Sequence, residues 1–365
     1  MIGRFQLSRR RQAGVTPVDY ARLTSFHRLP ARARRRLELT TSDRVTQAIL
    51  AVAGIIPLAA LAFLAYQLFE SAYPSIVFNG WGFFTGKVFS LGNLYGGTDE
   101  IRHGYHAAHG ARYGILPLIF GTLVSSLIAL VIAVPVSVGG AILLVEKVPA
   151  RFQSALGTFL ELLAGIPSVI FGLWGLYTFG PLLSRTVYKW IADLHIPWFS
   201  RPTGAGQGLL TASLVLAVMI IPIIASVTRE LVRSVPTTAK EGAIGLGLTS
   251  SEMVRAVTLP YIRTGVIAAS ILGWGRALGE TIAVLIISGN FLNAYPHNVF
   301  SPFSSIAATI AAFLDGALTD ATHMGIHALA ELGLVLMAIT LITNFGGRLL
   351  TRRFTDTGLP VGRGV

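Results

Sequence analysis

Six long apolar runs follow one another along the chain, separated by stretches that carry most of the polar and charged residues. They lie at residues 46–69, 113–145, 155–183, 207–228, 264–289 and 326–345. Because about 20 apolar residues in a helix cross the hydrocarbon core of a bilayer, each run is long enough to span a membrane. The pattern predicts an all-α integral membrane protein with six transmembrane helices.

Prolines and small polar residues interrupt two of these runs. Pro135 lies inside the second run, where we expect the helix to bend. The segment 121–126 and Ser137 in the same run are suited to close helix packing, which we favour over the lining of a polar pathway. The third run is broken at residues 165–168. Glu161 lies near the cytoplasmic end of this run, where we expect its carboxylate to be solvated at the membrane interface.

The stretches between the runs predict loops and interfacial segments. Residues 71–112 are rich in glycine and contain His103, His106 and His109. Side chains at i, i+3 and i+6 do not all share one helical face, so a solvated loop is favoured over a metal site. Tryptophans in the segment 184–206 are typical of a membrane–water interface. The apolar segment 301–313 predicts a surface or re-entrant helix.

Composition supports membrane insertion and excludes an ordinary soluble domain. Hydrophobic residues make up 53% of the chain and charged residues 13%, whereas charged residues are roughly a quarter of soluble domains. The absence of cysteine excludes disulfides and thiolate metal sites. Residues 1–44 hold eleven arginines and three acidic residues. Because no aromatic residue is interleaved with the arginines inside either basic cluster, a cytoplasmic tail facing solvent or lipid is favoured over RNA binding.

The distribution of lysine and arginine gives the orientation of the spans. With the N-terminus inside, the cytoplasmic segments hold 22 of these residues and the opposite loops hold 6, while Arg276 lies within a span. This asymmetry follows the positive-inside rule and predicts that both termini are cytoplasmic. The organisation is then a basic tail (1–44), a membrane domain (45–350) and a short C-terminal tail (351–365).

A polar, glycine-rich segment at residues 235–260 separates the fourth and fifth runs on the cytoplasmic side. It contains two capping-box patterns, Thr238 with Glu241 and Thr249 with Glu252. These predict two short helices outside the membrane, joined by a turn around Gly245 and Gly247. Small residues along the first helix would let it lie close to the backbone of another protein.

This segment resembles the EAA loop of ABC-transporter permeases. The matching residues are Glu241, Gly242, Ala243, Gly247, Val257, Leu259 and Pro260, with Gly242 in place of alanine and Val257 in place of isoleucine. The resemblance implies a coupling helix that docks into a cleft of a cytoplasmic ATPase. Glu241 could instead act only as a capping residue, and both roles are compatible.

Two further segments, 161–175 (ELLAGIPSVIFGLWG) and 275–290 (GRALGETIAV followed by an ISGN ending), are similar to PstC-type permeases of phosphate importers. This resemblance implies a type I ABC importer permease fold and transport of inorganic phosphate. It also implies a PstA-like permease, two copies of a PstB-like ATPase and a PstS-like phosphate-binding protein as partners. ATP and magnesium would bind in the ATPase, with no cofactor in this chain.

Arg276 and Glu280 are ionisable residues inside the fifth predicted span, where an unpaired charge costs several kcal/mol. Spaced at i and i+4, they can neutralise each other on one helical face. They could form a purely structural ion pair. We favour a substrate pathway in which Arg276 offers its planar donors to an oxyanion and Glu280 keeps the anion from being trapped, as the PstC resemblance also implies.

Catalytic motifs are missing from the sequence. It contains no phosphate-binding loop of the G-x-x-x-x-G-K-[ST] type, so the energy for transport must come from a partner. Two alternatives to a phosphate permease stay open. The same architecture could carry molybdate, sulfate or another oxyanion, or the chain could be a stand-alone secondary transporter or a membrane enzyme, which would need no ATPase.

Overall fold

The computed structural model describes residues 41–193, 198–199, 206–293 and 295–355, which leaves most of the predicted basic tail outside the described residues. The chain divides into two compact units between Phe63 and Leu64, inside the first helix. The described part of the first unit is the beginning of that helix. All further elements belong to the second unit.

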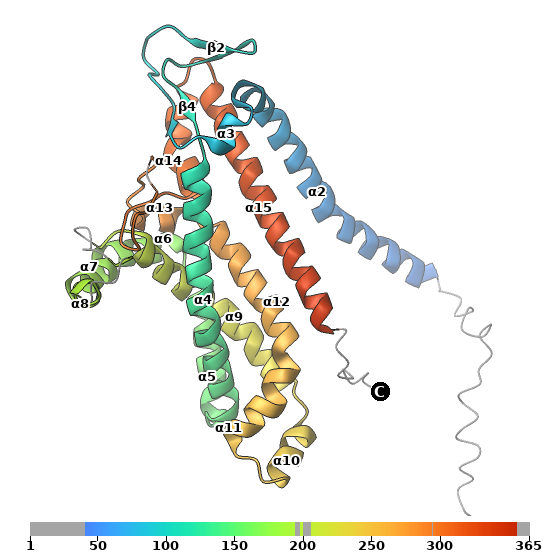
Figure 1. Ribbon diagram of the computed structural model, residues 1–365. Helices are drawn as coiled ribbons and strands as arrows, with labels where there is room; N and C mark the ends of the chain where they lie inside the picture. The colour runs from blue at the N-terminus through green and yellow to red at the C-terminus, as the bar shows by residue number, and fades with distance from the viewer. Residues whose placement is uncertain (1–40, 194–197, 200–205, 294, 356–365) are drawn as a thin grey trace, which may run out of the picture. The chain divides into compact units, whose positions relative to one another are not determined.

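Helices dominate the described residues (Figure 1). The α-helices are α2 (Thr41–Asn79), α3 (Gly82–Thr85), α4 (Leu116–Glu146), α5 (Ala150–Ala164), α6 (Ser168–Trp174), α7 (Gly180–Arg185), α8 (Val187–Asp193), α9 (Leu209–Arg233), α10 (Thr237–Gly245), α11 (Ser250–Met253), α12 (Leu259–Leu278), α13 (Ile282–Ile287), α14 (Ile306–Leu318) and α15 (Met324–Thr355). Two π-helical turns are η3 (Gly175–Phe179) and η4 (Val254–Thr258). Two small antiparallel sheets pair β1 (Phe89–Ser90) with β4 (Arg112–Tyr113) and β2 (Glu100–Arg102) with β3 (Tyr105–Ala107).

Five helices of the described chain are long and apolar enough to cross a membrane, and a bent pair makes a sixth candidate. The bent pair is α5 with the helix that begins at α6, and its two halves meet at 88°. The bend falls on the break predicted at residues 165–168: Pro167 lacks an N–H and disfavours a helical residue before it. The prediction of six spans is therefore confirmed, with the third one sharply bent.

The fifth span differs from its prediction at both ends. The helix that begins at Ser250 continues through η4 into α12, so the second short helix predicted outside the membrane is not separate. The π turn ends at Thr258, two residues before Pro260, and its wider turn accommodates the missing N–H and the bulk of the proline ring. The helix then ends at Leu278, and α13 follows after a break at residues 279–281.

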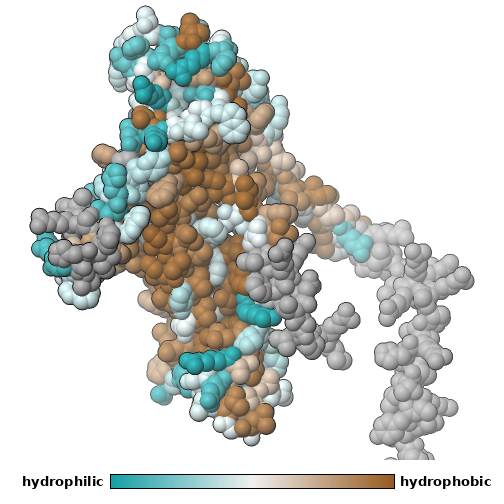
Figure 2. All heavy atoms as spheres, viewed as in Figure 1, coloured by the Kyte–Doolittle hydropathy of each residue, from teal (hydrophilic) through white to brown (hydrophobic). Residues whose placement is uncertain are grey.

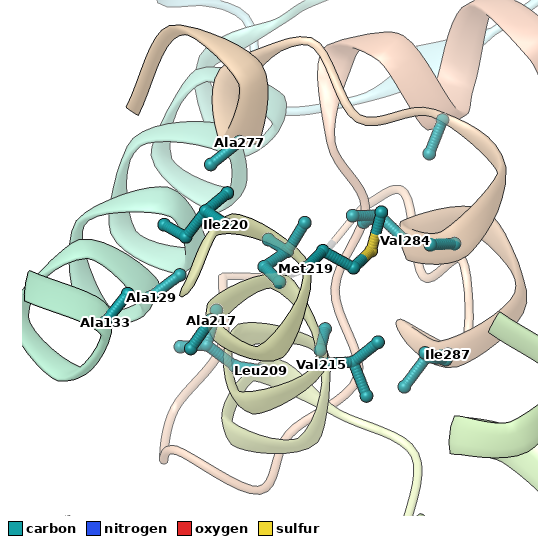
Figure 3. Close-up of a cluster of buried hydrophobic side chains, with 14 of the residues drawn as sticks. Ala129, Ala133, Leu209, Val215, Ala217, Met219, Ile220, Ala277, Val284 and Ile287 are labelled. Atoms are coloured by element: carbon teal, nitrogen blue, oxygen red, sulfur yellow. The ribbon is translucent and has the colours of Figure 1, made fainter. Parts of the chain in front are cut away.

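The central core lies where α4, α9, α12 and α13 meet, and small side chains let these helices approach closely (Figure 3). Ala129 and Ala133 of α4 are fully buried there. A Cβ added to Gly273 of α12 would lie 2.8 Å from Ile224 of α9. Ser137 donates a hydrogen bond to the Ile221 carbonyl at 3.1 Å, which confirms the predicted packing role of this serine.

The ends of the second unit are more polar than its middle. On the face that Figure 2 shows, apolar side chains cover the middle of the helices, and polar side chains gather at the end that carries the strands and at the end that carries α10. A second buried cluster lies below the strands and includes Phe83, Phe89 and Tyr113 together with residues of α14 and α15. The predicted helix within 301–313 exists as α14, which starts at Ile306 after a Ser305 cap.

Candidate functional site

The first part of the coupling segment forms α10 and the turn after it, at one end of the second unit (Figure 1). Glu241 and Gly242 are exposed on α10, whereas Ala243 is 7% exposed and packs inward. The helix ends with the Leu248 N–H bonded to the Ala243 carbonyl at 3.2 Å. Gly247 has φ +87°, a left-handed conformation that glycine adopts without strain, so the glycine of the motif ends the helix.

One of the two predicted capping boxes is present. Thr249 accepts a hydrogen bond from the Glu252 N–H, and the Glu252 carboxylate accepts one from the Thr249 N–H at 2.8 Å. The Thr238 capping box is wrong, because the N-cap of α10 is Pro236, two residues earlier, and α10 has no side-chain cap. Pro236, the residue before the helix, has a φ angle fixed by its ring and has no hydroxyl or carboxylate that could cap the helix. Within the part of the chain that the structure describes, the exposed Glu241 carboxylate has no hydrogen bond or ion pair.

A partly buried ion pair joins α10 to the end of α4. Lys240 Nζ lies 2.7 Å from Glu146 Oε1, and the two side chains are 15% and 14% exposed. Lys240 also donates to the Val232 carbonyl of α9 at 3.4 Å. Beside it, an apolar cluster centred on Val232, Val235 and Ile262 joins α9 to α12. The coupling segment is therefore fixed to three helices at once.

The remaining motif residues, Val257, Leu259 and Pro260, form the junction between η4 and α12. Val257 packs against the same apolar cluster, while Leu259 is 36% exposed. They belong to the continuous helix that runs from Ser250 to Leu278. This helix physically links the coupling segment to Arg276.

Arg276 and Glu280 form an ion pair at the far end of that helix. Arg276 Nε lies 3.5 Å from Glu280 Oε1, with side chains 39% and 10% exposed. The pairing is as predicted, but the shared helical face is wrong, because Gly279 ends α12 and places Glu280 in the break before α13. Ser168 at the start of α6 also interacts with the Glu280 carboxylate. The carboxylate is held from two sides, and the guanidinium is partly free.

An open cavity of about 420 Å³ lies beside Arg276, between α12 and α15. Its lining includes Gly275, Arg276, Thr340 and Asn344. A second cavity of about 550 Å³ shares Leu272 and Asn344 with the first and reaches Arg348. Together they form a groove along α12 and α15 with a cation at each end, and with the hydroxyl of Thr340 and the amide of Asn344 beside Arg276. Such a groove can hold and pass a small anion.

Asn344 was missed as a candidate, although an amide inside the sixth apolar run is a detectable signal. Glu331 in the same run was missed as well. It is 3% exposed and accepts a hydrogen bond from Ser75 of α2 at 2.6 Å. An acidic residue within an apolar run indicates that its carboxylate makes a buried polar contact.

The other residues discussed from sequence lie apart from the groove. Glu161 is 61% exposed, as expected at an interface, and it bonds Arg229 of α9 at 3.2 Å. The three histidines lie on or near the β2–β3 hairpin and are exposed, which agrees with the predicted loop. His106 lies 3.5 Å from Asp99. Trp198 is exposed, and most of the segment around it lies outside the described residues.

Comparisons with known proteins agree with this architecture. Residues 133–356 match the model of the family "Binding-protein-dependent transport system inner membrane component". The chain is 49% identical over 319 residues to the phosphate transport system permease protein PstC 1 of Mycobacterium tuberculosis, covering 86% of this chain and 94% of the relative. It is 42% identical over 299 residues to PstC of Pasteurella multocida, covering 80% and 88%.

The fold also resembles that of a chain in a solved ABC-transporter structure. A crystal structure of a bacterial alginate ABC transporter, in complex with a periplasmic protein that carries an alginate pentasaccharide, contains a chain similar to this one. The TM-score is 0.51 at 18% identity, and the match covers 87% of this chain and 99% of the other. Family, spans and fold thus agree: the chain belongs to the inner membrane components of binding-protein-dependent transport systems, as a multi-pass, non-enzymatic permease subunit that works with the other components of an ABC importer.

Proposed function

We propose that this chain forms half of the translocation pathway of an ATP-driven importer of inorganic phosphate. The observation that carries the proposal is the continuous helix from Ser250 to Leu278, which has the coupling segment at one end and Arg276 in an open groove at the other. Phosphate is the solute named for relatives that align with most of the chain. The arginine fork suits a tetrahedral oxyanion.

Partners supply what this chain lacks. A PstA-like permease would cover the open groove between α12 and α15 and complete the pathway. Two copies of a PstB-like ATPase would bind magnesium and ATP, because the sequence has no phosphate-binding loop of its own. A PstS-like binding protein would deliver phosphate on the side opposite α10.

The mechanism is alternating access driven from the coupling segment. The free Glu241 carboxylate and the exposed Ile244 and Leu246 offer a polar and apolar surface to the ATPase. Movement of α10 passes to α4 through the ion pair of Lys240 with Glu146. It also passes along the helix from Ser250, roughly 40 Å in length, to Arg276. Tilting this helix would open the groove alternately, while Glu280 offsets the charge on Arg276 and lets the anion leave.

The direct test is reconstitution of the complete importer in proteoliposomes with the binding protein outside and ATP inside. Uptake of phosphate should require ATP and should resist competition from excess sulfate or molybdate. A Glu241→Ala variant should lose most of the co-purifying ATPase and insert normally into the membrane. Uptake without an ATPase subunit would support a stand-alone transporter, and stronger competition by another oxyanion would reassign the solute.

A further inference from the structure

A polar cavity of about 440 Å³ lies among the strands, at the end of the second unit opposite α10 (Figure 1). The charge count along the sequence places this end outside the cytoplasm. Glycines and polar residues line most of it. The lining residues are Asn79, Gly82, Gly86, Lys87, Val88, Glu100, Arg102, Ala111, Arg112, Tyr113 and Gly114.

The cavity carries an excess of positive charge. Arg102 lies 2.8 Å from Glu100 Oε2 and above the ring of Phe78, and the other oxygen of Glu100 accepts the Gly110 N–H at 3.1 Å. Both oxygens of the single lining acid are therefore occupied. In the described residues, the side chains of Lys87 and Arg112 have no hydrogen bond or ion pair. Two uncompensated cations remain at the cavity.

The backbone around these cations is held rigidly. Gly86 and Gly114 are in direct contact, and a Cβ added to Gly86 would lie 2.6 Å from the Gly114 Cα. The Gly114 N–H bonds the Val88 carbonyl at 2.8 Å, and Phe89 pairs with Tyr113 between β1 and β4. Phe83, Phe89 and Ile115 are buried beneath. The cavity is preformed, so a ligand would pay little for ordering the chain.

The chemistry of the lining selects the ligand class. The Tyr113 phenol is neutral at physiological pH at its ordinary pKa, and burial raises that pKa further, so this side chain adds no negative charge. Arginine and lysine donors in a concave site suit a small oxyanion and repel a cation.

We propose that this cavity binds a free inorganic oxyanion before it enters the pathway, as a receiving site separate from Arg276. The identity of the anion as phosphate rests on the proposed function. The site itself rests on Lys87, Arg112 and the glycine contact. A cationic pocket at the entrance would raise the local concentration of the solute released there.

The test is equilibrium binding of radiolabelled inorganic phosphate to the complete, nucleotide-free importer in nanodiscs, without the binding protein. An Arg276→Gln background removes the candidate pathway site. Saturable binding should persist in that background and weaken by about tenfold or more in K87Q or R112Q. The matched control is Lys189→Gln, which removes an exposed cation of α8 and should leave binding unchanged.

Three results would overturn the proposal. Saturable binding could be absent from the Arg276→Gln importer, or it could be unaffected by R112Q. Alternatively, a parallel docking measurement with the binding protein added could show that R112Q weakens docking while phosphate binding stays the same, which would make the cavity a protein contact. The proposed function is tested separately, by ATP-driven phosphate uptake. A negative result in these binding measurements would therefore overturn the receiving site and leave the proposed function standing.

Discussion

Glu331 shows how a single polar contact shapes this membrane domain. Its carboxylate is 3% exposed and accepts a hydrogen bond from Ser75, which in turn bonds Asn79 at 3.0 Å. The contact joins the end of α2 to α15 in a region that is otherwise apolar. Because water cannot replace a lost partner within the membrane, this contact stabilises the helix pair.

Glu331→Ala should therefore destabilise the protein by about 1 kcal/mol, since Ser75 loses its acceptor and a void is left. Glu331→Gln should be milder, because the amide keeps an oxygen that accepts from Ser75. Thermal unfolding of both variants in detergent measures the difference. An alanine variant as stable as the unchanged protein would show that the hydrogen bond contributes nothing.

Two glycines of the coupling segment distinguish the effect of backbone conformation from the effect of steric room for a side chain. Gly247 has φ +87°, which an L side chain rarely adopts, although nothing lies within 4 Å of its added Cβ. Gly242 lies inside α10 with equally open surroundings and an ordinary backbone. Glycine is therefore required at position 247 because of its positive φ angle, and not because a side chain would lack room there.

Gly247→Ala should strain the turn by about 1–2 kcal/mol and loosen the end of α10. Gly242→Ala should be tolerated and serves as the matched control. Hydrogen exchange of the α10 amides in the assembled importer measures the loosening. Equal protection in the two variants would contradict the conformational argument.

The ion pair of Lys240 with Glu146 makes α10 move with α4. Lys240→Ala should break this link, so that ATP hydrolysis continues while less phosphate is transported per ATP. Lys240→Glu combined with Glu146→Lys should restore much of the phosphate transport per ATP hydrolysed, because the reversed charges can pair again. The exposed neighbour Lys147→Ala is the control. The measurement is the ratio of hydrolysis to uptake in proteoliposomes, and an unchanged ratio in Lys240→Ala would remove this role.

Local patterns predict elements well and long-range contacts poorly. The spans and the Thr249 capping box follow from hydropathy and from spacing within a few residues. The partners of Lys240 and Glu331 are 94 and 256 residues away along the chain, and no local pattern reveals them. The end of α12 at Gly279 was also missed, because the apolar run continues through it.

At the scale of the whole molecule, the second unit has its polar sites at two ends and an open groove between them. The coupling segment lies at one end, the cationic cavity at the other, and Arg276 between them on the groove of α12 and α15. An open groove with a charged residue is costly in lipid. A second permease covering this face would remove that cost and form a closed pathway.

The most direct measurement is ATP-driven phosphate uptake by the complete importer carrying Arg276→Gln. Loss of a charged donor to the anion should reduce uptake by about ten- to a hundredfold. Co-purification of the ATPase should be unchanged, because Arg276 lies far from α10, and Lys189→Gln should transport normally. Unchanged uptake in an intact Arg276→Gln importer would contradict the account and leave this arginine a structural partner of Glu280.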